Sequence, residues 1–123
     1  MHELSMAASI MENVLAFAED HHLGRVLQVR LAVGELTSIQ PEELKFCYKS
    51  VTRETALRNS TLEIEDVMAR VRCHYCGYEG PPKYWLEDAG NLPVPTLQCP
   101  NCERETEATR GDDCVIRTIQ YAT

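Results

Sequence analysis

Two pairs of cysteines constrain the fold of this chain more than any other feature of its sequence. The pairs are Cys73 with Cys76 and Cys99 with Cys102, and Gly77 follows the first pair with the backbone freedom that a tight turn needs. A turn with this spacing directs both sulfur atoms into one space. Two such turns that face each other offer tetrahedral sulfur coordination, which Zn²⁺ and mononuclear iron prefer. We predict a four-cysteine metal site and favour zinc on availability, although the spacing also fits iron.

The predicted site is closed, because four thiolates leave no position for water on the metal. Closed sites of this kind are structural and not catalytic. Residues 73–111 show little regular apolar pattern and contain the only tryptophan, so a metal is expected to supply the stability that a core would otherwise give. His74 lies inside the first pair, and we expect an exposed imidazole or one beside the ligands, with exchange for a cysteine ligand as the alternative.

Outside this module the sequence predicts two helices. Apolar residues repeat with helical period over residues 4–19, and a second helix is indicated by Pro41 followed by Glu42 and Glu43. Cys47 falls on the apolar face of the second helix. A lone cysteine in that position is usually a small core residue.

Three strands are predicted as well. Residues 26–33 alternate, with Leu27, Val29, Leu31 and Val33 expected on one buried face. Residues 61–72 read as one strand whose apolar phase breaks at Glu65–Asp66, which predicts a β-bulge. The last strand covers residues 114–119 and includes Cys114, which we expect to fill the core.

The order of these elements predicts an α+β fold. We expect a mixed three-stranded sheet with two helices, and a zinc-ribbon module inserted between the second and third strands. The predicted domains are residues 1–72 together with 112–123, and residues 73–111. A module on a long hairpin could exchange between chains, so we expect a monomer or a weak, domain-swapped dimer.

The charge and composition exclude several classes of function. The net charge is −7 and the pI is about 5.0, which argues against nucleic-acid binding and against anionic membranes. No apolar run reaches the ~20 residues that span a bilayer, and the first residues lack the basic start of a secretory signal. We therefore expect a cytoplasmic protein. No phosphate-binding loop, catalytic triad or open metal site is visible, so we expect no enzyme.

The first three residues, Met1, His2 and Glu3, form a second candidate metal site. They bring together an α-amine, an imidazole and backbone amides, a nitrogen set that favours square-planar Ni²⁺ or Cu²⁺. From the residues alone, an ordinary exposed terminal histidine remains the simpler interpretation.

Longer stretches of the sequence carry a resemblance to a known family. They are "MHELSMAASIMENV" at the start, "VRLAVGELTSIQPEELKFCYKSVT" at residues 29–52, "LEIEDV" at residues 62–67, and both cysteine pairs. With these features the whole chain resembles the HypA/HybF family, the nickel metallochaperones for maturation of NiFe hydrogenases.

The resemblance implies one nickel site and one zinc site. His2 would be the essential nickel ligand, with terminal and backbone nitrogens from Met1 and Glu3. Cys73, Cys76, Cys99 and Cys102 would be the zinc ligands. The implied partners are a HypB-type nickel-binding GTPase and the NiFe hydrogenase large subunit, and some members of the family also serve urease. The chain departs from those members that carry a histidine directly after a cysteine pair, since Gly77 and Glu103 stand there.

Two other classes of function are alternatives to the metallochaperone. One is a zinc-ribbon module that binds protein or nucleic acid without any nickel function, and the other is a redox protein with an iron centre or a reactive cysteine pair. The negative charge disfavours nucleic acid as a partner. The facing cysteine pairs favour a bound metal over a dithiol.

Overall fold

The computed structural model describes residues 2–86 and 93–123. The elements, in chain order, are α1 (His2–Asp20), β1 (Arg25–Gly34), the 3₁₀ helix η1 (Glu35–Thr37), α2 (Pro41–Thr52), β2 (Thr61–Val67), β3 (Arg70–Arg72), β4 (Glu79–Gly80), β5 (Tyr84–Trp85), β6 (Val94–Pro95), β7 (Glu107–Arg110) and β8 (Cys114–Ala122). The chain forms two compact units. The helical unit comprises Met1–Ala32, Ile39–Glu65 and Val115–Thr123, and the cysteine unit comprises Val33–Ser38 and Asp66–Cys114.

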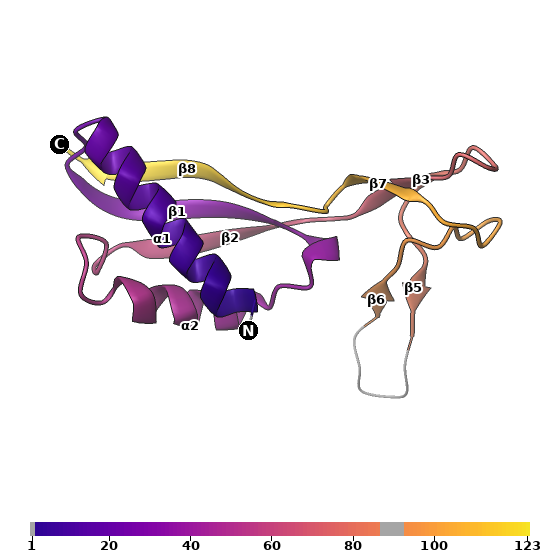
Figure 1. Ribbon diagram of the computed structural model, residues 1–123, viewed down its shortest axis with the longest axis horizontal. Helices are drawn as coiled ribbons and strands as arrows, with labels where there is room; N and C mark the ends of the chain where they lie inside the picture. Colours follow the sequence, from indigo (N-terminus) through magenta and orange to yellow (C-terminus); the bar gives the residue numbers. More distant parts are fainter. Residues whose placement is uncertain (1, 87–92) are drawn as a thin grey trace. The chain divides into compact units, whose positions relative to one another are not determined.

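The helical unit contains the predicted mixed sheet with two helices. Its strand order is β2-β1-β8, and Figure 1 shows β1 and β2 running in one direction while β8 returns in the other. The two helices pack against each other. Apolar side chains from both helices and from β1 are almost fully buried: Ala7, Ile10, Val14, Val29, Leu31, Leu44 and Tyr48. Most of this core follows the helical and alternating patterns, although Leu4, which the helical pattern places on the apolar face of α1, is 53% exposed. The fold class is confirmed.

The expected burial along β1 is wrong at one residue. Val29, Leu31 and Val33 are buried as predicted, but Val26 is buried too and Leu27 is 39% exposed. The burial phase therefore shifts between Val26 and Val29, so that the start of the strand presents its other face to the core.

The prediction of one continuous strand over residues 61–72 is also wrong, and the break in phase does not require a bulge at Glu65–Asp66. β2 ends at Val67 and β3 begins at Arg70, and the two strands belong to different sheets. Leu62 is buried in the helical unit, whereas Ala69 and Val71 are buried in the cysteine unit. The change of phase arises because the chain passes from one core to another.

The cysteine unit is built on the antiparallel sheet β4-β3-β7 and the hairpin β5–β6. η1 is fixed to this unit by hydrogen bonds from Gly34 N to Asp113 O and from Leu36 N to Gly111 O, both 2.8 Å long. Gly111 has a φ of 84°, and a Cβ there would lie 2.7 Å from Ala69 Cα, so only glycine fits. The predicted module 73–111 lies inside this unit, which also takes in residues 33–38, 66–72 and 112–114.

The carboxylate of Glu35 links separate elements of the cysteine unit. Its Oε1 accepts a hydrogen bond of 2.8 Å from the backbone N–H of Ala69, and its carboxylate also accepts one from the Tyr84 hydroxyl. This bond, with burial, raises the pKa of Tyr84 to about 12. One carboxylate thereby connects η1, the residue before β3 and the hairpin strand β5.

Candidate metal centre

The two cysteine turns have the same backbone hydrogen bonds. In the first turn, Cys73 N donates to Tyr78 O and Gly77 N donates to Cys73 O. In the second, Cys99 N donates to Arg104 O and Glu103 N donates to Cys99 O. Each turn therefore closes over the same number of residues, which is why the same two-residue spacing recurs in the sequence.

The turns bring four sulfur atoms into one cluster. The Sγ atoms of Cys73, Cys76, Cys99 and Cys102 all lie within 4.8 Å of one another. Cys73 and Cys102 are 3.5 Å apart, and Cys76 and Cys99 are 3.6 Å apart. Tetrahedral zinc with Zn–S bonds of about 2.3 Å requires sulfur separations of about 3.8 Å. The cluster is therefore suited to structural Zn²⁺ and needs only small shifts to hold it.

Polar contacts set the proton affinities of two of these thiols. Hydrogen bonds from the Asn101 side chain and from the Tyr78 backbone lower the pKa of Cys76 to about 6. The backbone of Arg104 lowers the pKa of Cys102, but desolvation and bonds to the neighbouring cysteines outweigh it and raise this pKa to about 11. Because zinc binds thiolates, binding displaces a proton from Cys102 more than from Cys76.

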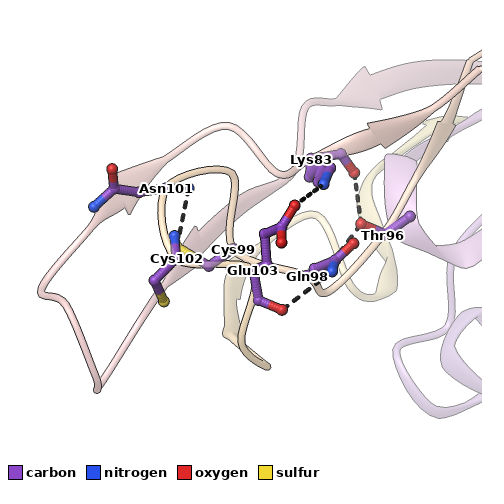
Figure 2. A network of polar contacts seen from close by, with 7 residues as sticks. All are labelled: Lys83, Thr96, Gln98, Cys99, Asn101, Cys102 and Glu103. Atoms are coloured by element: carbon purple, nitrogen blue, oxygen red, sulfur yellow. Dashed lines mark hydrogen bonds and ion pairs between the residues drawn. The ribbon is translucent and has the colours of Figure 1, made fainter.

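The second turn is anchored to the hairpin next to it, as Figure 2 shows. Lys83 Nζ lies 3.2 Å from Glu103 Oε1, and Gln98 Nε2 donates to Glu103 O at 3.1 Å. Lys83 O also accepts hydrogen bonds from the N and Oγ1 of Thr96. Glu103 has a left-handed φ of 66°, at the place where the first turn has Gly77 with a φ of 78°.

The sequence does not predict these contacts of the second turn. It does contain a sign of the left-handed backbone at Glu103. Because Gly77 and Glu103 occupy the same place in the two repeated turns, a left-handed φ could have been expected at residue 103. The guanidinium of Arg104 lies over the Tyr75 ring, 4.9 Å from its centroid, and so links the two turns. No local sequence pattern predicts this contact.

His74 is an exposed imidazole, as expected. Its Nε2 lies 2.7 Å from Glu107 Oε2, and both side chains are more than half exposed. The hydrogen bond from His74 lowers the pKa of Glu107. The contact ties the first turn to β7 and engages His74 with a carboxylate.

The structure places the candidate nickel residues at the start of α1. His2 is the first residue of the helix and is exposed, while Met1 lies outside the described residues. Glu3 is only 6% exposed, and its Oε2 accepts a hydrogen bond of 2.9 Å from Gln40 N. This bond, together with one from its own backbone, lowers the pKa of Glu3.

No side-chain cluster forms around His2 in the described part of the chain. Among residues 2–86 and 93–123, the four cysteines are the only group of three or more His, Cys, Asp or Glu side chains close enough to share a metal ion. Cys47 and Cys114 lie outside this group of cysteines. Both are half-buried, whereas the sequence predicts that they are buried in the core. Burial raises the pKa of Cys114. A metal at His2 would therefore depend on backbone nitrogens.

Comparison with known proteins gives one consistent result. The family model described as "Hydrogenase/urease nickel incorporation, metallochaperone, hypA" matches residues 1–121. The hydrogenase maturation factor HypA of Methanocella arvoryzae is 35% identical over 123 residues, which cover 98% of this chain and 97% of the relative. HypA of Methanopyrus kandleri is 35% identical over 131 residues, covering 98% and 92%. In described residues, no helix is long and apolar enough to cross a membrane.

Solved structures agree on the fold. The solution structure of the Ni metallochaperone HypA from Helicobacter pylori has a TM-score of 0.67 at 16% identity, covering 97% of this chain and 96% of that one. An α+β unit together with a four-cysteine site suited to Zn²⁺ defines a small metal-binding protein. The chain belongs to the HypA family, the nickel metallochaperones of hydrogenase maturation. The alternative of a zinc-ribbon module without nickel function is not favoured.

Proposed function

We propose that this chain binds Ni²⁺ through the α-amine of Met1, the amide nitrogens of His2 and Glu3, and the His2 imidazole. The observation that carries the proposal is the position of His2, exposed and first in α1. The first N–H groups of a helix do not take part in its i→i−4 backbone ladder, so a metal can use their nitrogens without breaking that ladder. Four nitrogen donors match the square-planar preference of Ni²⁺.

Glu3 has a different part in this proposal. Its carboxylate is nearly buried and is held by the backbone of Gln40. We infer that the carboxylate positions the N-terminal turn against the start of α2 and that only the amide of Glu3 serves as a ligand.

The remaining assignments extend the proposal to the whole chain. Zn²⁺ would be held by Cys73, Cys76, Cys99 and Cys102 and would fix the shape of the module. Residues 1–72 with 112–123 would carry the nickel, and residues 73–111 the zinc. A ligand set at an exposed chain end can be rearranged by a partner, which a delivery site requires. We propose a HypB-type GTPase and the NiFe hydrogenase large subunit as partners, and no catalytic step by the chain itself.

A calorimetric titration of the zinc-loaded protein with Ni²⁺ tests the nickel site. His2→Ala should abolish binding and leave the zinc content unchanged. His22→Asn is the matched control, because His22 has a left-handed φ of 52° that asparagine tolerates, and it should bind nickel as the parent protein does. Blocking the amine with one added residue should weaken binding strongly. Nickel affinity that survives His2→Ala would overturn the proposal.

A further inference from the structure

β7 has one edge on which strand pairing is incomplete. On one side β7 pairs with β3. On the other side the preceding residues are paired, since Gln98 bridges Glu105 and Thr106 N donates to Leu97 O at 2.7 Å. This pairing stops at Thr106. In the described part of the chain, no further strand or loop backbone bonds to the outer edge of Glu107–Arg110.

A groove of about 680 Å³ lies along this edge. Its lining includes the apolar side chains Leu36, Pro95 and Leu97 and the carboxylates Glu105, Glu107 and Asp112. Leu97 is 44% exposed, so its apolar surface is accessible from the groove. Glu107 contacts His74, whereas Glu105 and Asp112 have no ion pair among the described residues.

We propose that this groove binds an extended segment of a partner protein in which basic and apolar residues alternate, added as a strand to the free edge of β7. Addition of a strand to a sheet edge gives affinity through main-chain hydrogen bonds, and pockets for alternate side chains give specificity. Alternate side chains of a strand point to opposite faces. One set would contact Leu36 and Leu97, and the other would reach the carboxylates of Glu105 and Asp112.

The negative charge of the groove favours a basic partner segment over other occupants. A groove with three carboxylates repels an acidic segment and the phosphates of nucleic acid. It also disfavours a second copy of this chain, whose net charge is −7. The inference does not depend on the proposed nickel site, because no residue of the groove belongs to the N-terminal turn.

The test uses the full zinc-loaded chain without nickel and an alternating lysine–valine peptide of seven residues as the probe. Binding is followed by NMR amide shifts and by amide exchange. Shifts should centre on Glu105–Arg110, and amides at the outer edge of β7 should become protected. Glu105→Gln with Asp112→Asn should weaken binding about fivefold, because two exposed ion pairs are lost. Glu63→Gln, an exposed carboxylate of β2 in the other unit, is the matched control and should change nothing.

Two altered probes separate the contributions. A glutamate–valine peptide should not bind, and N-methylation of alternate amides in the lysine–valine peptide should remove binding by blocking the main-chain bonds. The proposal is overturned if the shifts fall outside the groove. It is also overturned if the glutamate peptide or the N-methylated peptide binds equally well, or if the double variant retains full affinity. An unchanged zinc content in each variant shows that the cysteine unit is intact.

Discussion

The backbone N–H of Gln40 donates a hydrogen bond of 2.9 Å to the carboxylate of Glu3, which lies 37 residues earlier in the chain. Gln40 is the N-cap of α2 and has no side-chain cap of its own, so Glu3 supplies an acceptor at that helix start. A carboxylate in this place also matches the positive end of the helix dipole. The first turn of α1 is thus fixed to α2 by the residue that follows His2.

This relationship predicts a pH-dependent protection of the Gln40 amide. The pKa of Glu3 is lowered in the folded protein, so the bond is at full strength above the usual carboxyl pKa and is lost as the pH falls through the lowered value. Amide exchange should show Gln40 protected at pH 7 and losing this protection only when the pH falls below the ordinary range of carboxyl pKa values. In Glu3→Gln the protection should be weaker and independent of pH. A Gln40 amide equally protected in both proteins would contradict the bond.

Loss of the zinc site should unfold one unit and spare the other. Structural zinc contributes about 10 kcal/mol or more, which is comparable with the whole stability of a small domain. Cys76→Ser should therefore lower the zinc content to near zero and remove amide protection from β3, β4 and β7. Protection in α1, α2 and β1 should remain, because their core is separate. Cys47→Ser changes a half-buried cysteine outside the cluster. This control variant should have the same zinc content as the parent protein.

Much of this architecture could be predicted because it depends on local patterns. The cysteine turns follow from spacing, and Gly77 has the positive φ that was expected of it. α1 and α2 follow from helical period and from Pro41 at a helix start. Each of these features is determined by residues within a few positions of one another.

The predictions that failed required knowledge of distant partners. A change of apolar phase near Glu65 has the same appearance whether a strand bulges or passes into a second core, and here it passes into a second core. The contacts of Glu35 with Ala69 and of Glu3 with Gln40 join residues more than thirty positions apart. The residues around Glu3 and Glu35 are like those around any acidic residue at a helix start. The sequence therefore gives no sign of these two contacts.

Glu35 should control the ionisation of Tyr84. Its hydrogen bond and negative charge both favour the neutral phenol, and with burial they raise the pKa of Tyr84 to about 12. The contribution to stability is present below the usual value of about 10 and is lost as the pH rises through the raised one. NMR titration of labelled tyrosine carbons should show this late ionisation, and Glu35→Gln should return it toward about 10. Glu79→Gln, a carboxylate of the same unit paired with Arg72, should leave Tyr84 unchanged.

The left-handed backbone at Glu103 predicts an unusual order of stability among variants. Glu103→Ala and Glu103→Gly both remove the Lys83 contact, so their difference isolates the cost of a φ of 66° for a residue with a Cβ. We expect the glycine variant to be more stable than the alanine variant by about 1 kcal/mol, measured by thermal unfolding of the zinc-loaded cysteine unit.

The first cysteine turn provides the reciprocal experiment. Gly77 has a φ of 78°, and a Cβ added there would meet no atom within 4 Å, so Gly77→Ala changes the backbone energy alone. It should destabilise the unit by about 1 kcal/mol, the same difference as at residue 103. Equal stability of the alanine and glycine forms at both positions would show that the turns relax to another backbone conformation. The agreement of the two differences would establish that the repeated turns impose the same left-handed residue after each cysteine pair.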